Sequence, residues 1–230
     1  NCEYDTARAF AEEGAIPHIF VFRNETEEMI FDSIDGLVEL LDKCQIIAFP
    51  GGFSSGDEPD GSAKFIVNVL QNEKVKNAVH ALLDRDGLIL GICNGFQALV
   101  KSGLVPYGRI MTLDDKAPTL FRNNINRHIS TVVQTRVASN NSPWLAHEKV
   151  GDVYSIAVSH GEGKFVATDE MVEELFAKGY LLMSNNENSI EIFDGNLDGE
   201  VEIIDNELSG DDNLNNKNID VKSGDEIVIV

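Results

Sequence analysis

One stretch, residues 88–97, constrains the fold of this chain more than any other. A short apolar run, Leu88–Ile92, leads into the pattern G-x-C-x-G from Gly91 to Gly95, with Cys93 at its centre. Flanking glycines let the backbone bend sharply, and a strand that turns directly into a helix pushes the side chain at the bend outward. The stretch therefore predicts a buried strand, a tight turn at Cys93 and a helix that begins just after it.

Two interpretations of Cys93 follow from this pattern. In the first it is the thiol form of a nucleophile elbow, because a sulfur at the N-terminus of a helix is favoured as a thiolate. In the second it is a buried structural cysteine beside a strand, which is a common place for this residue.

The first half of the chain alternates short apolar runs with amphipathic segments. Strands are expected at Ile19–Phe22, Ile46–Phe49 and Leu88–Ile92. Helices are expected at Thr6–Glu13, Glu27–Asp42, Ala63–Leu70, Val75–Arg85 and Asn94–Ser102. This alternation is typical of an α/β fold with a doubly wound, mainly parallel sheet flanked by helices.

The pattern changes after residue 108. Arg109–Leu113, Ile129–Val137 and Val153–Val158 resemble strands with polar loops between them, and a helix is expected at Asp169–Lys178, capped by Gly179. Alternation of apolar and polar residues predicts one exposed face, so we expect an added antiparallel section.

Composition excludes several classes of function. A net charge of −21 argues against a basic surface that binds nucleic acid. No apolar run approaches the length of a membrane span, so no membrane association is expected. Three widely spaced cysteines form neither a disulfide framework nor a zinc pattern, which favours a reducing, cytoplasmic location. The start at Asn1 shows no signal-peptide pattern, and it reads as though an earlier segment were missing.

The last fifth of the chain has a different composition from the rest. Residues 184–230 contain 13 acidic and two basic residues, about half of the net charge. We therefore predict one domain at 1–182 and an acidic extension at 183–230, β-like or disordered. Ile227–Val230 is expected to form a last strand that pairs with Ile190–Phe193 or Val201–Ile204.

Part of this extension fits the spacing of a calcium-binding loop. Carboxylate and amide oxygens recur at the positions used by loops of the EF-hand or dockerin type, from Asp194, Asn196, Asp198 and Asp205. No amphipathic helix follows, and a segment this rich in Asp and Asn produces such a match easily by chance. The alternative is a solvated acidic hairpin or disorder.

A glycine-rich loop, Pro50–Gly61, follows the strand predicted at Ile46–Phe49. Ligand sites of open α/β sheets lie at the carboxyl ends of the strands. The backbone N–H groups of Gly51 and Gly52 are therefore candidates for an oxyanion-binding arm, with the N–H of Asn94 as a second donor. The alternative is a flexible surface turn.

Three motifs together resemble a known family. Phe49-Pro-Gly-Gly-Phe-Ser-x-Gly-Asp, Gly91-Ile-Cys-Asn-Gly-Phe-Gln97 and Ser159-His-Gly-Glu-Gly-Lys-Phe165 occur in order and at fitting spacing. In these motifs the chain resembles the glutaminase domain of phosphoribosylformylglycinamidine synthases, which are class I (triad-type) glutamine amidotransferases. Asn1–Asp5 is similar to the segment that follows the first strand of that family. The resemblance covers about residues 1–182.

The resemblance implies hydrolysis of glutamine through a thioester on Cys93, with Gln97 helping to hold the substrate. In the family the ammonia passes to a synthetase module, fused upstream or present as a separate chain. That module uses ATP and magnesium to make formylglycinamidine ribonucleotide for purine synthesis. No cofactor is expected in the glutaminase-like domain itself.

Two departures from the family affect these expectations. The opening strand of the family is missing, which predicts an exposed edge and an unfilled core unless a preceding polypeptide supplies it. The late catalytic His-x-Glu is also missing, since no histidine follows His160. His160 and Glu162 have the spacing of a surrogate base, although the alternative is a wall of the site. Two other functions therefore remain: an impaired remnant or binding module, and an unrelated cysteine hydrolase.

Overall fold

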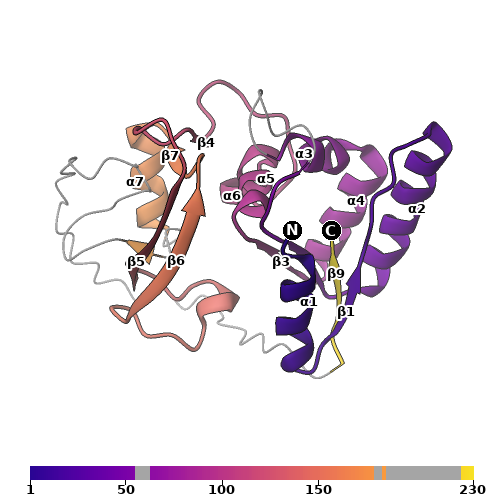
Figure 1. Cartoon of the computed structure of the whole chain (residues 1–230), viewed down its shortest axis with the longest axis horizontal. Helices are drawn as coiled ribbons and strands as arrows, with labels where there is room; N and C mark the ends of the chain where they lie inside the picture. Colours follow the sequence, from indigo (N-terminus) through magenta and orange to yellow (C-terminus); the bar gives the residue numbers. More distant parts are fainter. Residues whose placement is uncertain (55–62, 179–182, 185–223) are drawn as a thin grey trace. The chain divides into compact units, whose positions relative to one another are not determined.

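The computed structural model describes residues 1–54, 63–178, 183–184 and 224–230. The chain divides into two compact units, which are described separately (Figure 1). Unit 1 comprises Asn1–Thr119 and Val221–Val230, and unit 2 comprises Leu120–Asp220. Within the described residues, no helix is both long enough and apolar enough to cross a membrane.

Unit 1 is built on a four-stranded sheet whose neighbouring strands are parallel. Its strands, in spatial order, are β1 (Ile16–Ile19), β9 (Glu226–Ile229), β2 (Ile46–Phe49) and β3 (Leu88–Gly91). Every residue of β2 is buried, whereas β1 at the edge is partly exposed and contains Pro17, a residue tolerated on edge strands. The predicted parallel α/β sheet is therefore confirmed.

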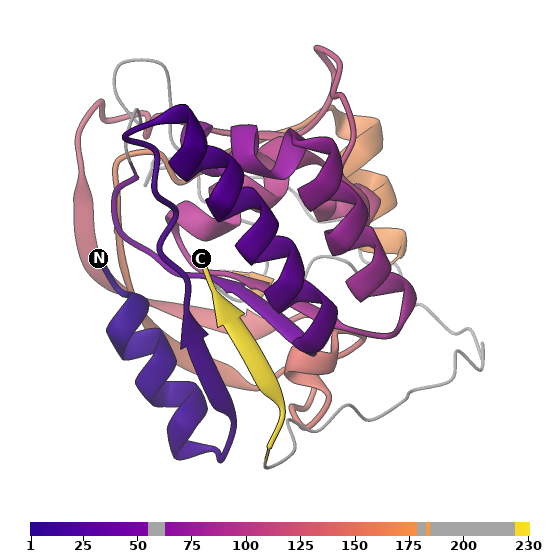
Figure 2. The same ribbon diagram turned by 90° about the vertical axis from the view of Figure 1, so that its right-hand side faces the viewer.

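Helices connect these strands. They are α1 (Glu3–Glu12), α2 (Glu27–Lys43), α3 (Lys64–Gln71), α4 (Glu73–Asp84), α5 (Asn94–Ser102) and a short α6 (Leu104–Tyr107). The helix α2 is capped by Thr26, whose side chain accepts from the N–H of Met29, and Gly36 does not interrupt it. Figure 2 shows α1 beside β1, away from α2 and α4.

The C-terminal strand β9 corrects two sequence predictions. It does not pair within the acidic extension. It lies between β1 and β2, with Ile227 opposite Pro17 on one side and Ile46 on the other (Figure 2). In the flavodoxin-like order 2-1-3-4-5, the first strand lies between the second and third. The strand β9 occupies that central position here, so the edges of β1 and β2 that face each other are paired and the expected unfilled core is absent from the described sheet.

Burial of its apolar side chains explains why β9 lies between β1 and β2. Ile227, Val228 and Ile229 are fully buried. Successive residues of a strand point to opposite faces, and Val228 joins the core cluster formed by α2, α4 and β2, which includes Leu37, Leu41, Ile47, Phe49, Val79 and Leu82. An all-apolar run buried on both faces is typical of the interior of a parallel sheet.

Unit 2 contains antiparallel strands, as the sequence predicted for this region. The long strands β5 (Ile129–Val137) and β6 (Val153–His160) pair along their length, with Val133 opposite Ile156, and β8 (Met183–Ser184) pairs with the other edge of β5. A second pair joins β4 (Thr119–Phe121) and β7 (Lys164–Val166). A 3-10 turn, η1 (Pro143–Leu145), and a helix, α7 (Asp169–Ala177), complete the described part.

Two predicted strands were wrong, one in position and one in kind. The first strand spans Ile16–Ile19 rather than Ile19–Phe22, because its register is set by β9. Arg109–Leu113 is not a strand: the N–H of Ile110 donates to the ring of His80, and the N–H of Met111 donates to Ser102. Within the motif Ser159–Phe165, β6 extends to His160 and β7 begins at Lys164, so only residues 161–163 lie between the two strands.

Candidate active site

The turn at Cys93 has the geometry of a nucleophile elbow. β3 ends at Gly91, α5 begins at Asn94, and Cys93 between them has φ 52° and ψ −108°. This conformation is unfavourable for a residue with a side chain, and such strain concentrates at functional sites. Cys93 is exposed. The thiol is therefore presented at the carboxyl end of the sheet, immediately before the first turn of a helix.

The glycines on either side of Cys93 are required by close packing. A Cβ atom on Gly95 would lie 2.0 Å from the carbonyl oxygen of Phe49, the last residue of β2. A Cβ atom on Gly91 would lie 2.8 Å from the carbonyl oxygen of Gly95. The start of α5 thus rests directly on the end of the neighbouring strand, and this contact holds the bend in place.

Cys44 shows what a structural cysteine in this fold looks like. It is fully buried at the end of α2, and burial together with the nearby charge of Glu226 raises the pKa of its thiol to about 11. The interpretation of Cys93 as a buried structural residue therefore describes Cys44 and not Cys93.

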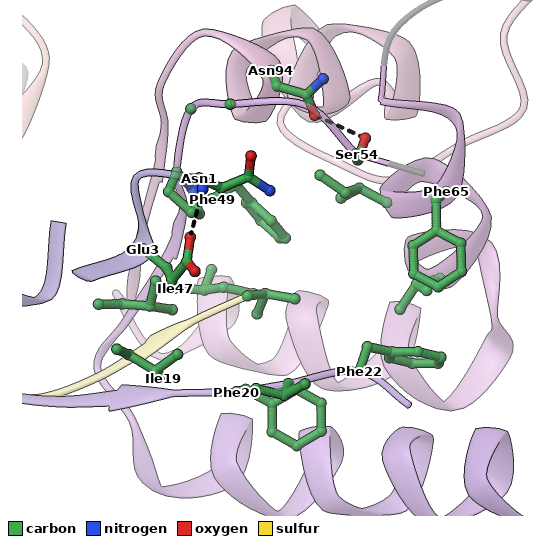
Figure 3. A pocket seen from close by; sticks show the side chains of 18 of the residues that line it. Asn1, Glu3, Ile19, Phe20, Phe22, Ile47, Phe49, Ser54, Phe65 and Asn94 are labelled. Atoms are coloured by element: carbon green, nitrogen blue, oxygen red, sulfur yellow. Dashed lines mark hydrogen bonds and ion pairs between the residues drawn. The ribbon is translucent and has the colours of Figure 1, made fainter. Parts of the chain in front are cut away.

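The loop after β2 lies against the elbow. A Cβ atom on Gly51 would lie 3.2 Å from the Cβ atom of Cys93. The hydroxyl of Ser54 donates to the side-chain oxygen of Asn94, 3.1 Å away, and so connects this loop to the first residue of α5 (Figure 3). The structure thus brings together four sequence-predicted residues, Gly51, Gly52, Cys93 and Asn94. The part of the predicted loop at residues 55–62 lies outside the described residues.

Gln97 lies one helical turn after Cys93. Its N–H donates to the carbonyl of Cys93 over 3.0 Å, and its side chain is buried although it is polar. Residues four apart share a face of a helix. Gln97 therefore lies on the face of α5 that continues from Cys93, one turn further along the helix.

A cavity of about 290 Å³ opens at the carboxyl ends of β1, β9 and β2. Figure 3 shows the aromatic rings of Phe20, Phe22 and Phe65 along its wall. Gly51, Gly52 and Asn94 also line it, whereas Cys93 does not. The cavity therefore extends to the loop and to the first residue of α5, but Cys93 does not form part of its lining.

In unit 2, the motif residues His160 and Glu162 lie on a turn organised by Asn123. The side-chain nitrogen of Asn123 donates to the carbonyls of Arg127 and His160, at 3.1 and 2.9 Å. Its side-chain oxygen accepts from the N–H of Gly163 at 3.2 Å and lies 3.0 Å from Nδ1 of His160. Because that oxygen can only accept, Nδ1 carries the proton and Nε2 is the basic nitrogen.

The surroundings of His160 favour its neutral form. Burial, followed by the charge of His128, lowers the pKa of the His160 ring below its ordinary value. The carboxylate of Glu162 lies 3.9 Å from Nε of Arg122, which makes an ion pair. The turn therefore presents a neutral imidazole with a defined tautomer.

The supporting residues Asn1, Ser54 and Asn123 were not identified as site residues from the sequence. Asn1 carried a partial signal, since Asn1–Asp5 is similar to a family segment, and Ser54 lies within the first of the three family motifs. Asn123 carried none, because it follows β4 in a polar stretch without a motif. The predicted calcium ligands Asp194, Asn196, Asp198 and Asp205 lie outside the described residues.

Comparison with known proteins shows which family the chain resembles. A model of the CobB/CobQ-like glutamine amidotransferase domain matches residues 1–197. The PurQ subunit of phosphoribosylformylglycinamidine synthase from Alkaliphilus metalliredigens is 34% identical over 65% of this chain and 59% of its own length. The corresponding subunit from Wolinella succinogenes is 30% identical over 85% of this chain and 78% of its own length.

The extent of these matches differs between relatives. The chain spans 59% of the Alkaliphilus relative and 63% of the PurQ subunit from Koribacter versatilis, less than two thirds of either. A solved structure, PurLQS from Thermotoga maritima, is similar in fold, with a TM-score of 0.55 and 23% identity over 82% of this chain and 70% of that chain. The match across residues 1–197 shows that the chain belongs to the CobB/CobQ-like glutamine amidotransferase domain family.

Proposed function

We propose that this chain hydrolyses glutamine through a thioester on Cys93 and supplies ammonia for the synthesis of formylglycinamidine ribonucleotide. The observation that carries the proposal is the elbow itself: an exposed thiol on a strained turn, with a glycine loop against its Cβ atom. Strained strand-to-helix turns of this kind present nucleophiles in acyl-transfer enzymes.

In the proposed reaction, the Cys93 thiolate attacks the side-chain carbonyl carbon of glutamine. The developing oxyanion accepts hydrogen bonds from the backbone N–H of Asn94 and from the Gly51–Gly52 arm. The base that takes the proton of the Cys93 thiol then donates it to the amide nitrogen, so that collapse of the tetrahedral intermediate breaks the C–N bond, releases ammonia and leaves a thioester. Attack by water then releases glutamate and regenerates the thiol. Gln97 is proposed to help hold the substrate.

Among the residues of this chain, His160 is the candidate for the base, with the wall of the site as its alternative role. Its Nε2 is the basic nitrogen because Nδ1 faces Asn123, and its lowered pKa keeps it neutral and able to accept a proton near neutral pH. Glu162 is proposed to shape the same turn through its ion pair with Arg122.

We propose a synthetase partner, fused or separate, that consumes the ammonia and provides the sites for ATP and magnesium. Two relatives named as subunits of a synthase and the similar PurLQS structure support this proposal. The organisation at 1–182 and 183–230, with a calcium loop in the second part, stays a prediction. A melting temperature unchanged by millimolar calcium would count against that loop.

A glutamine-mimicking electrophile tests the first proposal. Diazo-oxo-norleucine should alkylate Cys93 in the folded chain, with loss of N₂, and peptide mass spectrometry should find the adduct on no other cysteine. Cys93→Ser should remove both the adduct and the release of glutamate, whereas Cys44→Ala should retain both. A folded chain that is not labelled contradicts the proposal.

A second candidate function is a binding module that retains the pocket without turnover. It is favoured by the cavity beside the elbow, which Gly51, Gly52 and Asn94 line but Cys93 does not. Labelling of Cys93 without measurable release of glutamate would select it. If turnover occurs and His160→Ala leaves it unchanged, His160 is excluded as the base.

A further inference from the structure

The loop that carries Gly51 and Gly52 is held by the first residue of the chain. The side-chain nitrogen of Asn1 donates to the carbonyl of Phe53 over 3.0 Å. The side-chain oxygen of Asn1 accepts from the N–H of the same residue over 3.1 Å. One carboxamide therefore satisfies both backbone groups of Phe53, in the same two-way arrangement that strands use to pair.

The next residue fixes the peptide unit before this contact. The N–H of Cys2 donates to the carbonyl of Gly51 over 3.2 Å. In a trans peptide the carbonyl and the following N–H point in opposite directions. The N–H of Gly52 is therefore directed away from Cys2, so the contact with Cys2 holds one end of the peptide whose other side is attached to Asn1 through Phe53.

The absence of a side chain at Gly52 leaves room for the side chain of Asn1. Its φ is +123°, a conformation that residues with side chains rarely adopt. A Cβ atom on Gly52 would lie 2.5 Å from the side-chain oxygen of Asn1. Asn1 thus fills the space in which a side chain at position 52 would lie.

The far end of the loop is attached to the elbow helix. The hydrogen bond from Ser54 to Asn94 joins the loop to the residue whose N–H is the second proposed oxyanion donor. The loop is thus held by Asn1 and Cys2 on one side and by α5 on the other, and all of these residues belong to unit 1.

We propose that Asn1 is a positioning residue: its two hydrogen bonds to Phe53 hold the Gly51–Gly52 peptide so that the N–H of Gly52 meets the oxyanion. Asn1 touches neither the thiol nor the substrate in this role and acts through the loop. The inference rests on the proposed function, because an oxyanion arises only if Cys93 attacks a carboxamide.

The substitution Asn1→Ala removes both hydrogen bonds, and Asn1→Asp keeps only the acceptor. Donors aimed at an oxyanion act in the transition state. The kcat for glutamine hydrolysis should therefore fall about 10- to 100-fold in Asn1→Ala and less in Asn1→Asp, while KM stays within about twofold. Amide hydrogen exchange at Gly52 and Phe53 should become faster in the same order.

The matched control is Asn72→Ala. Asn72 caps α4 by accepting from the N–H of Lys74 over 3.0 Å, so the control also loses an asparagine contact to the backbone. It should leave kcat and the exchange of residues 52–53 unchanged. A kcat of Asn1→Ala equal to that of the control, or unchanged exchange at the loop, overturns the positioning role. A wild-type chain without glutaminase activity overturns the proposed function, and hydrogen exchange still decides whether Asn1 fixes the loop.

Discussion

The turn at Cys93 and the turn at His160 are built by different forces. The turn at Cys93 is shaped by packing: Gly95 lies against the backbone of Phe49, and the strand β2 beneath it is completely buried. The turn at His160 is shaped by hydrogen bonds from Asn123, and six of the eight residues of β6 are exposed. A well-packed interior transmits strain, so close packing can hold Cys93 in an unfavourable backbone conformation. The hydrogen bonds of Asn123 instead determine which ring nitrogen of His160 carries the proton.

This difference predicts unequal sensitivity to loss of apolar side chains, with the largest effect in the parallel sheet. Ile227→Ala in β9 should lower the free energy of unfolding by about 2–5 kcal/mol, because the removed atoms are completely buried. Val132→Ala in β5 should change it by at most about 0.5 kcal/mol, since Val132 is 67% exposed.

Urea unfolding, followed by fluorescence and circular dichroism, measures both values. Equal losses for the two variants would show that burial does not distinguish the two sheets. Loss of diazo-oxo-norleucine labelling in Ile227→Ala under native conditions would further connect β9 to the geometry of the elbow.

The next effect concerns the contact that holds the elbow. Gly95→Ala should destabilise unit 1 by about 1–3 kcal/mol and slow the labelling of Cys93, because the new methyl group meets a backbone carbonyl. Gly36→Ala makes the same change in α2, where the new Cβ atom would lie 3.5 Å from the Phe20 ring.

Gly36→Ala should stabilise the chain by up to about 1 kcal/mol, as expected for glycine in the interior of a helix. Chemical denaturation and the rate of labelling are the measurements. A Gly95→Ala variant as stable and as reactive as wild type would remove packing as the cause of the bend.

For the polar turn, a smaller effect is expected from the loss of Asn123. Asn123→Ala should cost about 1–2 kcal/mol, because three backbone groups lose their hydrogen bonds in a partly buried environment. Asn124→Ala, at the neighbouring exposed position, should cost at most about 0.5 kcal/mol. Hydrogen exchange at Gly163 reports the turn directly, and equal protection in both variants would contradict this role of Asn123.

The smallest effect is the contribution of His160 to the pH dependence of stability. Its pKa is lower in the folded chain than in the unfolded chain, so the unfolded state binds more protons between these two values. Stability from this group is therefore present in full above the unfolded pKa, near 6.5, and is lost as pH falls toward the folded value.

The difference in unfolding free energy between wild type and His160→Gln, measured from pH 5 to pH 8, isolates this contribution. The shared effect of His80, whose pKa is also lowered by burial, is common to both proteins. The relative stability of wild type should decrease on acidification, and an increase would reverse the assigned direction of the shift.

Local patterns were sufficient for much of this structure. The strand at Ile46–Phe49, the helix at Asn94–Ser102 and the strand at Ile129–Val137 coincide with their predicted limits. Each has a clear apolar periodicity, and glycine or polar residues mark its ends. Such signals depend only on residues that are close in the sequence. The elbow at Cys93 was predictable for the same reason.

Long-range pairing was not predictable. The N–H of Glu226 donates to the side chain of Gln45, which is 181 positions away. An apolar run such as Ile227–Val230 fits any strand position that buries it, so its sequence alone does not select a neighbour. The gap between β1 and β2 selects it, because both faces of the strand are buried there.

The sequence by itself thus determined the class of fold, the strained turn and the identity of its thiol, since these follow from residue types at short spacing. Only the tertiary structure decided which strand completes the sheet and which asparagines hold the two turns. Asn1 and Phe53, like Asn123 and His160, are brought together by folding, and a carboxamide shows no preference for a distant backbone group until the chain places one within reach.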